Sequence, residues 1–329
     1  MTTSTLEWNW RGANIRLDIA SSGTGPALLL LPALSSISTH HEMGPLAEHL
    51  APRYSTVRVD WPGFGARARP QVDWTPDAYS AFLAFLLTSV VPHPHAVIAA
   101  GHAASYALKY AASAPQATTR LVLIAPTWRG PLPTVLGERR PLLGRLRRLV
   151  DLPAIGPLVY RLNVNAFVVR RMGAGHVYTD PAFLTGERLR QKLAVVRAPG
   201  ARFASARFVT GGLDPLEGRD GFLDLGRRVR IPILLIYGAE TPPQSRAEME
   251  ALAAIPGMRS ITLPRGKLSV HEEFPGAVFE AMDPFLRRGS VPAPITSAAR
   301  ASICAPPACR RLRPISRRPR CPQGYRTCS

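Results

Sequence analysis

Short apolar runs alternate with segments of helical periodicity along most of the chain. The apolar runs predict eight strands, at residues 6–10, 15–20, 27–31, 56–60, 96–100, 120–125, 231–237 and 259–263. The first two alternate in character, which favours an antiparallel hairpin, whereas the later runs are continuously apolar, as in strands buried on both faces. Helices are predicted between them, at residues 42–50, 76–90, 104–114, 245–254 and 272–286. This order is typical of a mostly parallel sheet with helices on both faces.

The regular alternation stops between residues 128 and 228. In this stretch the sequence gives short amphipathic pieces interrupted by Gly and Pro, at 141–150, 158–172 and 181–196. An insertion of about 100 residues after the sixth strand predicts a mostly helical cap over one edge of the sheet. The predicted organisation is therefore a core made of residues 1–127 and 229–289, a cap at 128–228 and a C-terminal tail at 290–329.

The tail explains much of the chain's charge. The formal net charge is +19, and residues 290–329 contribute eight arginines, no lysine and no acidic residue. This Pro- and Arg-rich segment lacks apolar periodicity, so we expect it to be disordered. All four cysteines lie in it, at Cys304, Cys309, Cys321 and Cys328, and their spacing matches no paired zinc motif. We expect no metal, no cofactor and no nucleic-acid partner, because no recognition motif accompanies the charge.

One local motif points to catalytic chemistry and lacks its reactive atom. Residues 96–108 read AVIAAGHAASYAL, in which an apolar strand leads through Gly101 and His102 into an alanine-rich helix. This is the strand, turn and helix order of a nucleophile elbow. The position at which such an elbow carries its nucleophile is Ala103, whose methyl group cannot attack a substrate. The sequence therefore argues against covalent acyl transfer from this position.

Five segments in this order resemble the α/β-hydrolase superfamily, in particular its cap-bearing members related to esterases, epoxide hydrolases and haloalkane dehalogenases. They are the loop at 30–34, the Asp-Trp-Pro-Gly-Phe-Gly turn at 60–65, the elbow at 101–105, the Tyr-Gly-Ala-Glu-Thr segment at 237–241, and His271. The resemblance covers about residues 5–287. It implies the α/β-hydrolase fold, with a mostly parallel eight-stranded sheet, helices on both faces and a helical cap inserted after the sixth strand.

The resemblance also implies roles for particular residues. His271 stands where the family keeps its general base. Glu240 lies near the place of the family's acid and would orient His271, or it would instead cap the helix that follows. The family's oxyanion hole uses backbone N–H groups that correspond to Leu34 and Ala104, and these amides do not depend on the side chain at Ala103.

Further candidates lie in and near the cap. Trp128 is expected at the mouth of the pocket, and His176 and Tyr178 are candidate substrate contacts, with a structural hydrogen-bonding cluster around Asp180 as the alternative. The segment 139–150 alternates arginines with leucines. It could bind an anionic membrane surface or a phosphate-bearing substrate, or it could be a solvated face of the cap.

Three functions remain open at this stage. The first is an enzyme that acts on a small ester-like or hydrophobic substrate with His271 as base and an oxyanion hole, without an acyl-enzyme. The second is a catalytically inactive member of the fold that binds a ligand. The third is an esterase that uses a displaced serine such as Ser105. No apolar run is long enough to span a membrane, so we expect a cytoplasmic protein. The oligomeric state is left open.

Overall fold

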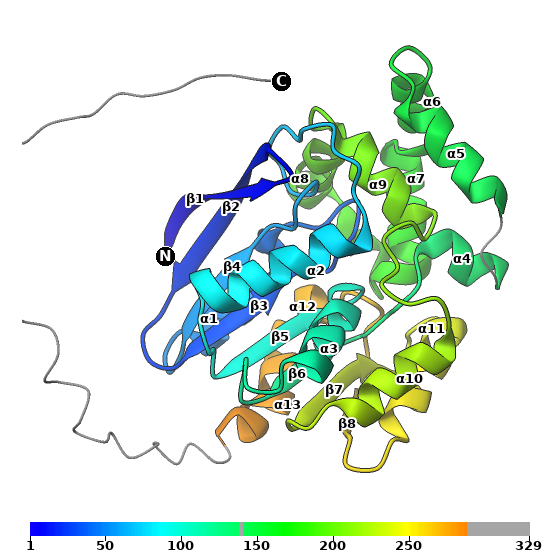
Figure 1. The fold of residues 1–329 in the computed structure, drawn as a ribbon. Helices are drawn as coiled ribbons and strands as arrows, with labels where there is room; N and C mark the ends of the chain where they lie inside the picture. Colours follow the sequence, from blue (N-terminus) through cyan, green and yellow to red (C-terminus); the bar gives the residue numbers. More distant parts are fainter. Residues whose placement is uncertain (138–140, 288–329) are drawn as a thin grey trace, which may run out of the picture. The chain divides into compact units, whose positions relative to one another are not determined.

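The computed structural model describes residues 1–137 and 141–287 of the chain. The predicted tail at 290–329, with its four cysteines, and the arginines at 139 and 140 lie outside the described residues. The structure is built on one eight-stranded sheet with the order β1-β2-β4-β3-β5-β6-β7-β8 (Figure 1). The strands are β1 (Thr2–Trp10), β2 (Ala13–Ser22), β3 (Ala27–Leu31), β4 (Ser55–Val59), β5 (Ala96–Ala100), β6 (Leu121–Ile124), β7 (Ile233–Gly238) and β8 (Arg259–Leu263).

Strand direction follows the predicted pattern. β1 pairs antiparallel with β2, and β2 pairs antiparallel with β4, whereas all the remaining neighbours are parallel. β1 begins four residues before the predicted strand, because Thr2 already pairs with Ser21. Residues at that end of β1 are exposed and polar, so the backbone ladder extends the strand where no apolar alternation marks it.

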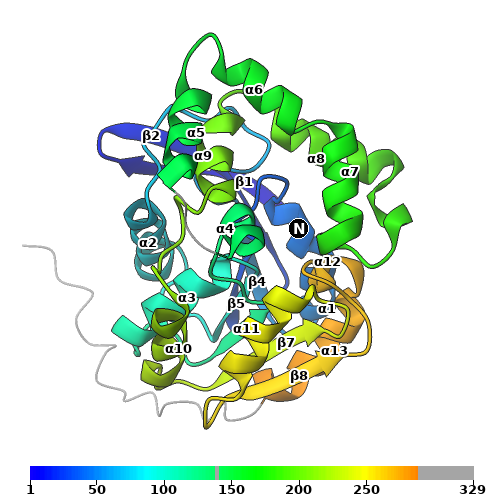
Figure 2. The same ribbon diagram turned by 90° about the vertical axis from the view of Figure 1, so that its right-hand side faces the viewer.

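Alternate side chains of the central strands enter two separate cores. Leu29 and Leu31 of β3 belong to a large cluster that includes residues of α2 (Pro76–Phe85), α3 (Ala103–Ser113) and α10 (Arg219–Arg228). Leu28 and Leu30 face the opposite side, where α1 (Gly44–Leu50) and α13 (Pro275–Arg287) cover the sheet. The sheet therefore lies between two helical layers (Figures 1 and 2), as the continuous apolar runs predicted.

Two predicted helices are divided in the structure. The predicted helix 272–286 is split into α12 (Val270–Glu273) and α13, because Pro275 starts a new helix. The predicted piece 158–172 is split into α6 (Gly156–Asn163) and α7 (Ala166–Met172), where the Asn165 side chain accepts hydrogen bonds from the first amides of α7. The predicted helix 76–90 is continuous from α2 into a π-helical turn, η2 (Leu86–Val90).

The insertion between β6 and β7 is helical, and its last helix packs with the sheet layer. It contains α4 (Pro131–Leu136), α5 (Pro141–Asp151), α6, α7, η3 (Gly173–Val177), η4 (Pro181–Leu184), α8 (Gly186–Arg197) and α9 (Ala201–Val209) before α10. Part of it has a small apolar core of its own, which includes Val169, Tyr178 and Leu193. In contrast, Phe222 of α10 is buried in the large core beside α3. The last helix of the predicted cap range thus covers the sheet.

The other described helices are η1 (His40–Met43), which precedes α1, and α11 (Pro243–Ala253), which lies between β7 and β8. The loops at the carboxyl ends of β3, β5, β7 and β8 lie at one edge of the parallel part of the sheet. This edge is where open α/β sheets place their ligands.

Candidate active site

The elbow has the backbone geometry that its motif predicts. β5 ends at Ala100, Gly101 has a positive φ of 52°, and α3 begins at Ala103. A methyl group on Gly101 would lie 3.2 Å from Cβ of Ala33, in the loop after β3, so a side chain there would crowd that loop. The Ser105 hydroxyl donates a hydrogen bond to the carbonyl of His102 at 2.8 Å and is fully buried.

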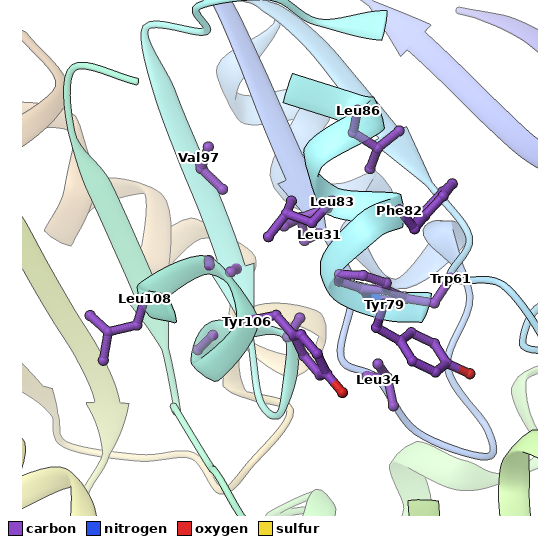
Figure 3. Packing of buried hydrophobic residues seen from close by; sticks show 14 of the residues in the cluster. Leu31, Leu34, Trp61, Tyr79, Phe82, Leu83, Leu86, Val97, Tyr106 and Leu108 are labelled. Carbon is purple, nitrogen blue, oxygen red and sulfur yellow. The ribbon is translucent and has the colours of Figure 1, made fainter. Parts of the chain in front are cut away.

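The surroundings of the elbow are apolar and closely packed. Ala103, Ala104, Leu34 and Trp128, four of the predicted site residues, belong to the large hydrophobic cluster. The aromatic rings of Trp61, Tyr79 and Tyr106 pack around Leu34 in this cluster, as Figure 3 shows. Ala103 has no exposed surface. The structure therefore places all four of these predicted residues in the buried core.

Trp128 lies at the junction between β6 and the insertion and is also buried. Its ring stacks on Phe222 with the centroids 6.4 Å apart, and the Arg129 guanidinium lies 4.6 Å from the Trp128 centroid. The indole N–H of Trp128 has no hydrogen-bond partner among the described residues.

Backbone amides near the elbow already donate hydrogen bonds to groups of the protein itself. The amide of Ala104 donates to the Gly101 carbonyl at 3.2 Å. In the loop after β3, the amide of Ala33 donates to Oε1 of Glu42 at 2.6 Å. The anion bound by this loop is thus a carboxylate of the chain itself, from the short helix η1.

His271 forms a buried pair with the same carboxylate. It lies on α12, directly after the loop that follows β8, and its Nε2 is 3.4 Å from Oε1 of Glu42. Neither side chain has exposed surface. The other ring nitrogen, Nδ1, has no hydrogen-bond partner within the described ranges. A carboxylate beside an imidazole stabilises the imidazolium that forms when the ring accepts a proton.

A lysine from the insertion lies between this pair and a second carboxylate. Lys192 of α8 lies 3.7 Å from Oε2 of Glu42 and 3.0 Å from Oε2 of Glu272, measured from its ammonium nitrogen. The hydroxyl of Tyr178 donates to the same oxygen of Glu272 at 2.7 Å. Side chains from η1, α8, α12 and the segment after α7 therefore meet at one buried cluster, which we call the His271 cluster: Glu42, Tyr178, Lys192, His271 and Glu272.

Burial and neighbouring charges in this cluster shift the pKa values of Glu42, Lys192 and Tyr178. Burial alone would raise the pKa of Glu42, but the hydrogen bond with His271 and the charge of Lys192 outweigh it and hold that pKa below its usual value. Burial alone would lower the pKa of Lys192, and the carboxylate of Glu272 reverses this and raises it. Burial raises the pKa of Tyr178. At neutral pH the cluster contains an ammonium group and an ionised Glu42.

Glu240 lies elsewhere and has other partners. It is exposed, and its Oε2 accepts hydrogen bonds from the Thr179 hydroxyl at 2.7 Å and from the Gly266 amide at 2.9 Å. These two hydrogen bonds lower the pKa of Glu240. The turn after β7 therefore directs this carboxylate to the amide of the next loop, and the carboxylate that the structure gives to His271 is that of Glu42.

The predicted residues of the cap have different environments. His176 is exposed, whereas Tyr178 is buried in the His271 cluster. Asp180 does not join Tyr178 but caps η4, where its carboxylate accepts from the Ala182 amide. Tyr178 is thus the only one of these three that the structure places beside His271.

Sequence reasoning did not identify Glu42, Lys192 or Glu272 as site residues. Glu42 and Glu272 were visible only as acidic residues at predicted helix starts. Lysine usage was the available signal, because the chain has only three lysines among its 41 basic residues, and Lys192 is one of them.

The described residues contain no cluster of three or more His, Cys, Asp or Glu side chains that could hold a metal ion. Among the helices of the described chain, none is long and apolar enough to cross a membrane.

Comparisons with known proteins agree with this architecture. Residues 28–281 match the model of the Alpha/beta hydrolase family. No curated protein matches the sequence closely enough to count as a relative. A solved hydrolase from Pseudomonas aeruginosa superposes with a TM-score of 0.65 at 21% identity, covering 86% of this chain and 98% of its own.

Two further solved structures show the same likeness. The epoxide hydrolase CorEH has a TM-score of 0.64 at 16% identity, with 86% of this chain and 100% of its own covered. An esterase from Thermogutta terrifontis has a TM-score of 0.61 at 20% identity, with 87% of this chain and 98% of its own covered. At these identities the likeness concerns the fold.

Proposed function

Since this chain belongs to the alpha/beta hydrolase family, we propose that it is an enzyme that acts on a small organic substrate through acid–base chemistry at His271 and Glu42. The observation that carries the proposal is the buried pair of these two side chains, with Nε2 and Oε1 3.4 Å apart. Ala103 supplies no nucleophile, so the reaction proceeds without an acyl-enzyme.

In the proposed reaction His271 accepts a proton from water or from an acidic position of the substrate. Its Nδ1 is the ring nitrogen available for this step, because Nε2 faces Glu42. Glu42 stabilises the imidazolium, and His271 returns the proton to the product or leaving group. Lys192 keeps Glu42 ionised, which preserves its effect on the imidazole.

Backbone amides would stabilise the negative charge that develops on the substrate. The amides of Leu34 and Ala104 correspond to the oxyanion hole of the family. In this structure the Ala104 amide makes a long hydrogen bond to Gly101, which the substrate oxygen would replace. Because His271 has no exposed surface and the loop that carries it is bound to the segment 177–180, the substrate enters after this segment moves.

The proposal is tested by turnover on a panel of p-nitrophenyl acetate, p-nitrophenyl butyrate and styrene oxide. We expect His271→Ala to lower kcat/KM by about 10²–10⁴, the range typical of a general base. Ser105→Ala serves as the matched control and should change it less than twofold, roughly the effect of a substitution away from the chemistry. Loss of turnover in the serine variant with retention in the histidine variant would refute the proposal.

A second candidate is a ligand-binding protein without turnover. It is favoured by Ala103, because a methyl group at the nucleophile position of the elbow cannot attack a substrate. This candidate predicts saturable binding of a small hydrophobic ligand that survives His271→Ala, with no product formed. Product formation by the wild-type protein rules it out.

The third candidate is an esterase that uses Ser105 as a displaced nucleophile. Its hydroxyl is buried and bound to the His102 carbonyl. We therefore expect no covalent labelling by a fluorophosphonate probe, measured as intact protein mass.

A further inference from the structure

Exposed apolar side chains are concentrated in one part of the molecule. Among the described residues, twelve large hydrophobic side chains are exposed, and ten of them lie between residues 135 and 172. They are Val135, Leu136, Leu142, Leu149, Leu152, Ile155, Leu158, Leu162, Phe167 and Met172. Scattered exposed apolar residues are normal, but a concentration of this kind marks an interaction surface.

These residues lie on α4, α5, α6 and α7 and on the turns between them. In Figure 1 α5 and α6 lie at the end of the insertion that is remote from the sheet, and Figure 2 shows α6 at the same outer end. The two most exposed of these ten side chains, Phe167 at 72% and Leu162 at 66%, belong to neighbouring helices, at the start of α7 and the end of α6. Both side chains face solvent in this structure.

The charges on the same helices are almost all positive. Residues 141–172 contain six arginines and a single acidic residue, Asp151, which pairs with Arg207. Five of these arginines are exposed, namely Arg145, Arg148, Arg161, Arg170 and Arg171. Arginine stems lie along apolar surface while their guanidinium groups reach the polar layer. Apolar side chains surrounded by cations are the composition of helices that lie in a membrane interface.

We propose that helices α5, α6 and α7 form a membrane-docking surface that binds bilayers containing anionic lipid. Apolar side chains such as Leu158, Leu162 and Phe167 enter the boundary between headgroups and acyl chains, and the exposed arginines contact lipid phosphates. The insertion would then pass hydrophobic substrates from the bilayer toward the carboxyl edge of the sheet. The proposal stands independently of the catalytic one, because it rests on the outer surface of the insertion and not on the His271 cluster.

The apolar part of the surface is tested by vesicle co-sedimentation of the full chain. Vesicles of phosphatidylcholine with phosphatidylglycerol are compared with phosphatidylcholine alone at physiological salt. We expect Leu162→Ser with Phe167→Ser to reduce binding to the anionic vesicles by about tenfold or more, because the inserted apolar area is lost. The matched control is Ile261→Ser, which removes an exposed apolar side chain from β8 and should leave binding unchanged.

The charged part is tested by a second matched pair. Arg170→Gln with Arg171→Gln should weaken binding to anionic vesicles by about tenfold or more, since each arginine near the surface contributes about 1 kcal/mol. Arg227→Gln with Arg228→Gln removes the same charge from α10 and should have a much smaller effect. Circular dichroism verifies that each variant is folded, and the high exposure of the substituted side chains makes folding defects small.

Three results would overturn the proposal. Equal loss of binding in both arginine pairs would show that net charge alone holds the protein to the vesicles. Unchanged binding after the double serine substitution would show that the apolar residues do not insert. Self-association in sedimentation velocity that the double serine substitution abolishes, without vesicle binding by the wild type, would assign the surface to a second copy of the chain.

Discussion

Glu42 is the residue on which the proposed site depends, because three different groups hold its carboxylate. The Ala33 amide and His271 share Oε1, and Lys192 lies near Oε2. An ionised carboxylate without solvent exposure is costly unless it is paired and hydrogen-bonded. These partners therefore determine both its ionisation and its position.

The ionisation of Glu42 predicts a pH dependence of stability. Its folded-state pKa lies below the ordinary value of 4.5, so its stabilising effect is complete above about pH 4.5 and is lost as the pH falls toward the lower folded-state pKa. We expect Glu42→Gln to lower the free energy of unfolding by about 2 kcal/mol at pH 7, as for a hydrogen-bonded charge. The difference in the free energy of unfolding between the wild type and Glu42→Gln should become smaller below pH 4.5.

Urea unfolding of both proteins between pH 3 and pH 8 measures this difference. Glu187→Gln is the matched control, because Glu187 is an exposed glutamate whose partners, Arg190 and Gln191, are neighbours on the surface of the same helix. A difference between wild type and Glu42→Gln that stays constant across the whole pH range would contradict the role assigned to Glu42.

At the residue level the sequence revealed Ala103 and His271 but not Glu42. Ala103 stands inside a local motif, and His271 follows a predicted strand, so both could be placed by counting along the chain. Glu42 and His271 are 229 residues apart, and no spacing rule connects them. Glu240 was predicted in place of Glu42 because it was the acid nearest to the expected turn, and the direction of its side chain depends on the Gly266 and Thr179 groups that bind it.

At the scale of elements, α12 connects the core to the cap through its acidic residues. Glu272 binds Lys192 and Tyr178, and Glu273 accepts hydrogen bonds from the amides of Thr179 and Asp180 at 2.8 and 2.7 Å. Nearby, the Ser269 amide donates to the Val177 carbonyl. The segment 177–180 is thus held against the loop that carries His271, and in the proposed function these contacts open to admit the substrate.

Glu273→Ala removes two of these contacts without altering the His271 cluster. We expect hydrogen exchange of the Thr179 and Asp180 amides to become faster by about tenfold, because two hydrogen bonds to a carboxylate are lost and local opening costs correspondingly less. Exchange in the β5 and β6 strands should stay the same. The measurement is exchange mass spectrometry of peptides that cover 174–184.

The control for this variant is Glu187→Ala, which removes an exposed carboxylate from the cap helix α8. Unchanged exchange at 177–180 in Glu273→Ala, or equal acceleration in both variants, would show that Glu273 does not hold the segment.

The helices and strands could be predicted from the sequence more completely than the residues of the candidate site. The central strands are continuous apolar runs buried on both faces, and this composition identified them. The break at Pro275 and the cap at Asn165 divided predicted helices, because a proline at N1 and a side-chain cap can begin a new helix inside a continuous apolar pattern. The placement of α10 with the sheet depends on the packing of Phe222 against distant residues, which no local pattern shows.

At the scale of the whole molecule, the proposed site combines parts that the chain brings together only by folding. The loop after β3 and η1 supply an amide and a carboxylate, α12 supplies the imidazole, and α8 of the insertion supplies the ammonium group. The same insertion carries the proposed membrane-docking surface on its outer helices. A substrate taken from a bilayer would meet the cap first and the His271 cluster only after the cap opens.

The central claim is that Glu42 and His271 act as one catalytic pair. A double-mutant cycle tests it most directly, with kcat/KM measured on the panel substrate that the wild type turns over fastest. We expect Glu42→Gln to lower kcat/KM by about 10², His271→Ala by about 10³, and the double variant by no more than His271→Ala alone, because residues that act as a unit are not additive. Independent, multiplicative losses, or full activity of Glu42→Gln, would contradict the account.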